Sequence, residues 1–181
     1  MKNIKLLAIL FLSTLVFTSC EDDHDDHDHG SDEELITTVV YTLTDGTNAV
    51  VIEWEDLDGD TGNAPTITSG TLSANTSYTG SIQLLNRTES PAEDITLEVS
   101  AEADEHEFFY TSTVSGLNIT KTDTDGNGNP LGVTTSLSTG NSGTGSLTVV
   151  LKHEPTKPNN GTSTDAGGST DIEVTFNISI Q

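Results

Sequence analysis

The chain has 181 residues, of which 29 are acidic and only 6 basic, giving a formal net charge of −23. Hydrophobic residues make up 32%, below the roughly 45–50% of an average globular protein, so the chain can build one small core. The acidity excludes nucleic acid as a partner, because its phosphates would be repelled. A single cysteine excludes an intramolecular disulfide and a thiolate metal cluster.

The N-terminal segment is typical of a secretion signal that ends in a lipidation site. Lys2 and Lys5 precede an apolar run over residues 6–16, which is too short to span a bilayer and leads to Cys20. This pattern resembles a bacterial lipobox, so we expect residues 1–19 to be cleaved and Cys20 to carry a lipid anchor. The expected location is the bacterial outer membrane, on its periplasmic or cell-surface face. An ordinary cleaved signal with a free Cys20 is the alternative.

The stretch after the cysteine is acidic and rich in histidine, and residues 21–34 include no apolar side chain. Such a segment cannot bury enough surface to offset its ordering entropy, so residues 20–34 are predicted to be the lipidated cysteine and a disordered tether. The tether serves either as an export signal or spacer, or as a metal-binding strip, because imidazole suits zinc and copper. The candidate metal ligands in it are His24, Asp25, His27, Asp28 and His29.

From residue 35 onward, β-branched and aromatic residues form short runs between Gly, Asn and Asp turns, which is typical of strands. The pattern predicts one domain over residues 35–181, an antiparallel Ig-like β-sandwich of about eight strands. A Gly/Ser/Thr/Asn-rich loop over residues 155–168 is expected to be mobile, and Leu72, Tyr78, Ile82 and Leu84 are expected in the core. The predicted strands cover residues 35–44 and 49–54, paired as a hairpin, and 66–72, 78–85, 117–120, 131–137, 147–152 and 172–180.

Residues 90–106 fit two kinds of secondary structure. Ser90, Pro91 and Glu93 match a capping box with proline at the first helical position, and Ile95 and Val99 then share one helical face. Apolar residues also occupy alternate positions from 95 to 103, as they would on a strand. The capping box and the proline favour one short helix near residues 91–106, and a strand stays open as the alternative.

Two histidines of the predicted domain have carboxylates beside them in the sequence. Glu102 and His106 share one face whether residues 91–106 are helical or extended, and on a strand Asp104 joins them. If the second histidine lies alongside, the nitrogen and oxygen donors suit zinc or copper. Surface histidines with no metal role are the alternative. The predicted site consists of Glu102, His106, His153 and Glu154.

Two acidic turns, residues 56–60 and 123–127, resemble calcium loops with a glycine at the tight turn. Neither has the glutamate that an EF-hand carries at its twelfth position, so ordinary Asp/Gly turns compete with calcium binding as the interpretation. The candidate calcium ligands are Asp56, Asp58, Asp60, Asp123, Asp125 and Asn127. The sequence has no nucleophile elbow, zinc-protease helix motif or phosphate loop, so we expect neither an enzyme nor an organic cofactor.

Five stretches together are similar to a family of small Bacteroidetes lipoproteins, which often carry a His/Asp/Glu-rich strip after the cysteine. These stretches are residues 34–39, 102–109, 129–132, 151–155 with Lys157, and 166–172. Members of that family are often labelled "type 1 periplasmic binding fold superfamily protein", which implies a two-lobed α/β ligand-binding protein. This chain is far shorter and shows no βαβ alternation, so the fold that we expect remains the β-sandwich. The strip implies a role beside an outer-membrane transporter in metal uptake.

These observations favour a lipid-anchored accessory protein of the cell envelope that binds zinc or copper and assists an outer-membrane transporter. An Ig-like adhesion or glycan-binding module with no metal role is the alternative. Convergence of His106 and His153 would favour the first function, and a groove lined by aromatics such as Trp54 and Tyr78 would favour the second.

Overall fold

The computed structural model describes residues 35–59 and 62–181. Among these residues there is no helix of the length and apolar character that crossing a membrane requires. The predicted signal and tether lie outside the described residues, as do the candidate site residues Cys20, His24, Asp25, His27, Asp28, His29 and Asp60.

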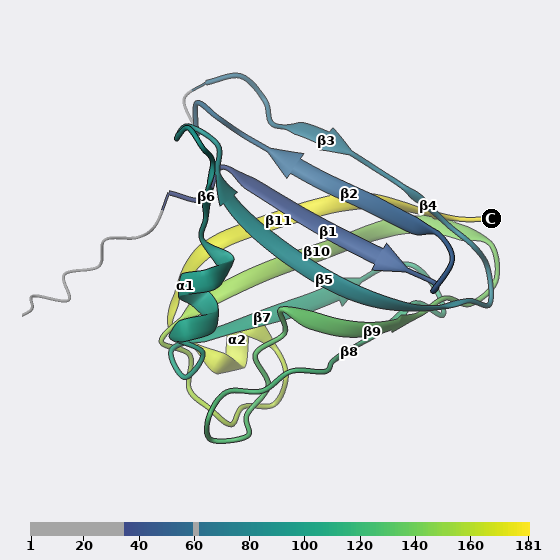
Figure 1. Ribbon diagram of the computed structural model, residues 1–181. Coiled ribbons are helices and arrows are strands. Elements are labelled where there is room, and N and C mark those ends of the chain that lie inside the picture. Colours follow the sequence, from purple (N-terminus) through teal and green to yellow (C-terminus); the bar gives the residue numbers. More distant parts are fainter. Residues whose placement is uncertain (1–34, 60–61) are drawn as a thin grey trace, which may run out of the picture. The chain divides into compact units, whose positions relative to one another are not determined.

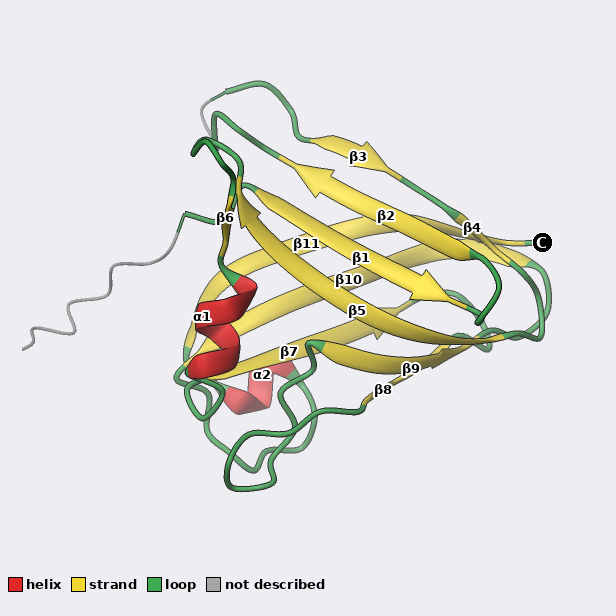
Figure 2. Ribbon diagram, in the orientation of Figure 1, coloured by secondary structure: helices red, strands yellow, loops and turns green. Residues whose placement is uncertain are grey.

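The described residues form two β-sheets that pack as a sandwich, which confirms the predicted fold class (Figures 1 and 2). The larger sheet has the order β3–β2–β1–β5–β9–β8, with β6 on the end of β5, and the smaller sheet has the order β4–β11–β10–β7. All pairings between these strands are antiparallel except that of β4 with β11. The strands are β1 (Thr38–Thr44), β2 (Ala49–Glu55), β3 (Thr66–Thr68), β4 (Thr71–Leu72), β5 (Ser77–Asn86), β6 (Glu93–Asp94), β7 (His106–Ser112), β8 (Asn118–Lys121), β9 (Thr134–Ser138), β10 (Gly143–His153) and β11 (Ser169–Ile180).

The core between the sheets follows the alternation of the sequence. On β11, Val174, Phe176 and Ile178 are buried, while the residues between them face solvent. The predicted core residues Leu72, Tyr78, Ile82 and Leu84 are all buried, and the predicted hairpin of β1 and β2 is present. We call this apolar layer the inner core.

The predicted strand over residues 66–72 is divided in the structure. Residues 66–68 form β3 at the edge of the larger sheet, whereas residues 71–72 form β4 in the smaller sheet. The chain therefore passes from one sheet to the other at Ser69 and Gly70. Because of this division, and because β6 and β7 were not among the predicted strands, the described residues contain more strands than the eight expected.

The predicted helix near residues 91–106 is present only as α1 (Thr96–Ala101), and it does not start at Ser90–Pro91. Glu93 and Asp94 are extended because they pair with the end of β5, and this pairing delays the helix by about one turn. Ile95 and Val99 are buried on one face of this segment, as the helical interpretation expects, so the strand alternative is wrong over residues 96–101.

The loop predicted to be mobile, residues 155–168, packs on the outer face of the smaller sheet. It contains α2 (Ser163–Ala166), whose N-cap Thr162 accepts a hydrogen bond from the Asp165 backbone. Ala166 is fully buried and forms a second apolar cluster with Phe109 and Val150. We call residues 155–168 the cover segment. Its composition suggested mobility. The contacts that anchor it are made with residues distant in the sequence, so the composition does not reveal them.

Candidate metal centre

His106 and His153 lie opposite each other where β7 begins and β10 ends. His106 is the first residue of β7 and His153 the last residue of β10. Each lies two positions from an inward-facing residue of its strand, Phe108 or Leu151, and so on the same side of the sheet. Their rings stack with centroids 4.8 Å apart and planes 9° apart. Strand pairing thus brings together two histidines that are distant in the sequence.

Both nitrogens of His106 face protein groups. Nδ1 lies 3.1 Å from the backbone carbonyl oxygen of Glu102, and because a carbonyl oxygen only accepts, Nδ1 carries the proton. Nε2 lies 3.8 Å from Oδ2 of Asp171, which stands at a β-bulge between β10 and β11. His106 is also buried, with 6% of its surface exposed. It is therefore held as part of the protein interior.

His153 instead belongs to a more open group with Glu105 and Glu154. One donor atom from each of the three residues lies within 4.8 Å of the others, and Nε2 of His153 is 3.8 Å from Oε2 of Glu105. The two glutamates are exposed and His153 is partly buried. This group offers one imidazole nitrogen and two carboxylates to solvent.

Backbone geometry places the two glutamates side by side. The Glu154 amide donates to the Glu105 carbonyl over 2.6 Å, and Glu154 adopts a left-handed conformation with φ of +50°. Gly168 closes the same corner, because a Cβ at this position would lie 2.2 Å from the carbonyl oxygen of His153. Glycine is therefore required where the chain enters β11.

The group has the donor chemistry of an open zinc or copper site. Zinc at about 2.0–2.1 Å from nitrogen and oxygen donors in tetrahedral geometry holds those donors about 3.4 Å apart. The exposed glutamates would have to move inward by about an ångström, which rotation of their side chains allows. Three protein donors leave one coordination position for water or an exchanging ligand.

The predicted ligand set is met only in part. His153 and Glu154 belong to the group, but Glu102 lies just after α1 and reaches His106 through its backbone rather than its carboxylate. Because α1 ends at Ala101, the helical spacing that linked Glu102 to His106 does not exist. Glu105 and Asp171 were missed; reading His106 as the start of a strand would have placed Glu105 at the same sheet end.

The two calcium-like loops use their carboxylates internally. Asp56 accepts from the backbone amides of residues 58 and 59, and Asp58 accepts from the backbone and side chain of Asn63. Asp123 accepts from the amides of residues 132 and 134. Asp56 forms an Asx turn, whereas the hydrogen bonds of Asp58 and Asp123 join residues that lie five to eleven positions apart in the sequence.

Asp125 is held most firmly of these carboxylates. It is buried and accepts from the backbones of Asn127 and Asn129 and, over 3.4 Å, from Lys157. Burial raises its pKa, but the hydrogen bonds outweigh this effect and hold the pKa below its ordinary value. Asn127 contributes its backbone amide to this turn, which is a donor and not a metal ligand.

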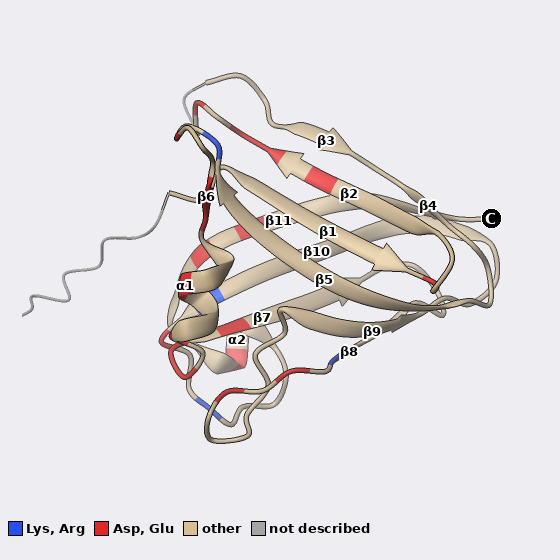
Figure 3. Cartoon of the chain, viewed as in Figure 1, with Lys and Arg blue, Asp and Glu red and all other residues tan. Residues whose placement is uncertain are grey.

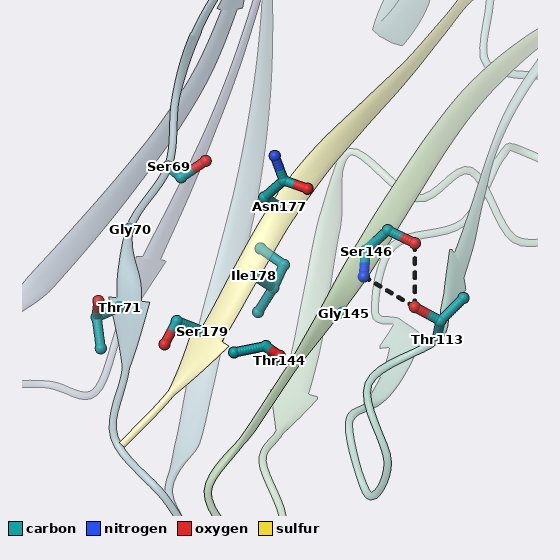
Figure 4. Close-up of a pocket in the computed structure, with 10 residues that line it drawn as sticks. All are labelled: Ser69, Gly70, Thr71, Thr113, Thr144, Gly145, Ser146, Asn177, Ile178 and Ser179. Atoms are coloured by element: carbon teal, nitrogen blue, oxygen red, sulfur yellow. Dashed lines mark hydrogen bonds between the residues drawn. The ribbon is translucent and has the colours of Figure 1, made fainter.

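An uncharged hollow of about 560 Å³ lies against the outer faces of β10 and β11 (Figure 4). Its lining consists of hydroxyl, carboxamide and glycine residues with a single isoleucine, and Thr113 and Ser146 are hydrogen-bonded to each other within it. None of the lining residues is a histidine or carboxylate, so it is no metal site. The lining residues are Ser69, Gly70, Thr71, Thr113, Thr144, Gly145, Ser146, Asn177, Ile178 and Ser179.

Trp54 and Tyr78 do not line one groove. Tyr78 is buried, and its hydroxyl accepts a hydrogen bond from the backbone of Ser73. Trp54 lines a different hollow of about 570 Å³ together with Leu35, Leu57 and Asp171. The aromatic arrangement that would have favoured glycan binding is therefore not formed by these two residues.

Acidic residues, red in Figure 3, are concentrated along the chain at the end of the domain that carries α1 and the start of β7. The candidate metal centre lies at this end, and the uncharged hollow involves the opposite ends of β10 and β11.

Comparison of the chain with models of known families, with curated proteins and with solved structures finds no match.

Proposed function

We propose that this protein binds a divalent transition metal, zinc or copper, through Glu105, His153 and Glu154. The observation that carries the proposal is the approach of these three donor groups to within 4.8 Å of one another at a solvent-exposed sheet end. Imidazole and carboxylate donors are those that zinc and copper accept, and the net charge of −23 raises the local concentration of cations.

The proposed role is reversible capture of the ion rather than structural stabilisation. A structural zinc site closes four protein ligands around the ion, whereas this group has three, and two of them are exposed. An exposed ion exchanges readily, which suits an accessory protein that passes metal to an outer-membrane transporter. After cleavage of the lipobox-like signal, the lipid on Cys20 would anchor the protein at the membrane, and the histidines of residues 21–34 would add metal-binding capacity.

Zinc titration followed by thermal unfolding tests the site in the full mature chain. To isolate the site from the tether, all variants carry alanine in place of His24, His27 and His29. A metal bound by the folded state raises the melting temperature by an amount that grows with free zinc. The shift should be smaller at pH 5 than at pH 7, because protons compete for the imidazole.

Two matched glutamine variants distinguish the structure-based site from the sequence-based one. Glu105→Gln removes a proposed ligand and should abolish most of the zinc-dependent shift, as should His153→Ala. Glu102→Gln makes the same change of charge three residues earlier and should leave the shift intact. Equal shifts in all these variants and the parent would show that the proposed centre binds no zinc.

A further inference from the structure

A buried glutamate, Glu107, contacts a partly buried lysine on one side and a partly buried asparagine of the cover segment on the other. Lys121, the last residue of β8, places Nζ 2.5 Å from Oε1 of Glu107 on β7. The other oxygen of the same carboxylate, Oε2, accepts a hydrogen bond of 2.8 Å from Nδ2 of Asn159 in the cover segment. One carboxylate therefore bridges an amine and a carboxamide that come from different parts of the fold.

We propose that Lys121 and Asn159 react to form an intramolecular isopeptide bond, with Glu107 moving the protons between them. Such a bond would covalently join β8 of the larger sheet to the cover segment on the smaller sheet. It is independent of the proposed metal site and uses none of its ligands.

The chemical step balances without an oxidant or any other co-reactant. The Lys121 ammonium gives a proton to Glu107, and the neutral Nζ attacks Cγ of Asn159 to form the new Nζ–Cγ bond. Glu107 passes its proton to Nδ2 and takes the second proton from Nζ. The Cγ–Nδ2 bond then breaks and ammonia leaves, taking the last proton from Glu107 as ammonium.

The surroundings of the three residues favour this reaction. Glu107 is only 2% exposed and the Lys121 side chain 16%, so little water competes for the groups. Burial lowers the pKa of Lys121, an effect that the hydrogen bond to Glu107 opposes, and a lower pKa increases the neutral, nucleophilic form of the amine. The Phe109 ring, 4.1 Å from Nζ, limits where the amine can move.

The carboxamide is also held in position to react. Oδ1 of Asn159 accepts a 2.8 Å hydrogen bond from the Gly161 backbone, which would stabilise the negative charge that develops on this oxygen. Nδ2 is fixed by Glu107 and by the Thr156 carbonyl. Gly132, at φ +99°, lets the lysine stem pass, because even a Cβ there would lie 3.1 Å from Cδ of Lys121.

The other two lysines of the described residues lack this arrangement. Lys152 donates to the Thr170 hydroxyl, and Lys157 donates to two backbone carbonyls and Asp125. Neither shares a carboxylate with a carboxamide. Lys121 is therefore the lysine that the geometry selects, and Lys152 provides a control lysine that lacks the arrangement.

Peptide mapping of the purified full chain tests the proposal. Trypsin does not cleave after an acylated lysine or between lysine and proline, so the bond would leave residues 88–152 joined to residues 153–181. Their combined mass should be lower than the sequence mass by one ammonia. Lys121→Arg, Glu107→Gln and Asn159→Ala should each abolish this joined species, while Lys152→Arg should retain it and preserve the cleavage site.

The outcomes separate a covalent bond from a salt bridge. Recovery of separate peptides 88–121, 122–152 and 153–181 from folded parent protein would overturn the proposal, and so would a joined species that persists in Lys121→Arg. Circular dichroism of Lys121→Arg, which keeps the positive charge, verifies that loss of the bond does not reflect loss of the fold. If the bond forms, this variant should melt at a lower temperature, because the cross-link no longer restricts the unfolded chain.

Discussion

The two sides of the smaller sheet are stabilised by different physical means. On its inner side, Phe108, Leu151 and Phe176 are fully buried in an apolar layer shared with the larger sheet. On its outer side, the apolar cluster of Phe109, Val150 and Ala166 is small, and charged groups around it hold the cover segment in place. Adjacent residues of β7 therefore contribute to two different layers, one apolar and one held largely by charged and polar groups.

The difference shows which interactions stabilise the fold of an acidic chain with few apolar residues. Non-directional burial forms the inner core, where side chains need only be apolar and of suitable size. The cover segment has too little apolar surface for that, so Lys157 and Asn159 fix it through directed hydrogen bonds to buried acceptors. The outer layer should thus be sensitive to single polar changes and the inner core to changes of volume.

The largest expected effect comes from neighbouring phenylalanines on the two sides of β7. Phe108→Ala should lower the free energy of unfolding by about 3–5 kcal/mol, because it leaves a cavity in the inner core. Phe109→Ala should cost less, about 2 kcal/mol, since the cover segment can settle onto the smaller side chain. Urea unfolding of both variants measures the difference, and equal losses would contradict the distinction between the layers.

A lysine pair tests the directed bonds of the outer layer. The Lys157 side chain is 6% exposed and donates to the carbonyls of Ala103 and His106 and to Asp125, so Lys157→Met removes one donor from each of three acceptors. We expect a loss of about 3 kcal/mol. Lys152→Met makes the same change of charge at a buried position that donates to one hydroxyl, and should cost about 1 kcal/mol.

Urea unfolding at neutral pH measures both lysine variants against the parent. If Lys157→Met cost no more than Lys152→Met, the cover segment would be held by its apolar cluster and not by the lysine. Protease digestion gives a second readout, because cleavage within residues 155–168 should accelerate in Lys157→Met before the inner core unfolds.

The inner core could be predicted from the sequence because it depends on local alternation. The residues of β11 show their inward and outward faces without knowledge of any partner strand. The outer layer could not be predicted, because Lys121, Glu107 and Asn159 become neighbours only through the tertiary fold. A buried glutamate in an acidic stretch such as residues 102–107 is indistinguishable by sequence from its exposed neighbours.

The candidate metal centre could be predicted from the sequence only in part, unlike the inner core, which could be predicted, and the outer layer, which could not. The predicted site required His106 and His153 to converge, and the pairing of β7 with β10 brings them together. The ligand set was only partly predicted, because the proposed helical spacing joined Glu102 to His106 across a helix that ends at Ala101. The register of β7, which brings Glu105 beside His153, depends on pairing that a single sequence does not reveal.

The last effect appears only at alkaline pH and belongs to the inner core. Tyr41 is fully buried, with its hydroxyl 2.6 Å from that of Thr135, and burial raises its pKa from 10.0 to about 12. The unfolded chain releases this proton near pH 10 and the folded chain only near pH 12. The stabilising effect of the neutral phenol is therefore complete below pH 10 and declines by about 2–3 kcal/mol as the pH rises to 12.

Tyr41→Phe isolates this contribution, because phenylalanine has no proton to release. The variant should lose about 1 kcal/mol at pH 8 through the missing hydrogen bond, and its stability should then fall less steeply than that of the parent above pH 10. Burial and the charge on ionised Tyr41 both raise the pKa of Tyr110, which remains in both proteins, as do all lysines. The difference between the two pH profiles therefore reports Tyr41 together with its electrostatic effect on Tyr110. Urea unfolding from pH 8 to 12 measures it. Parallel profiles would mean that the Tyr41 phenol ionises as readily in the folded protein as in the unfolded chain, and that the inner core admits charge as the outer layer does.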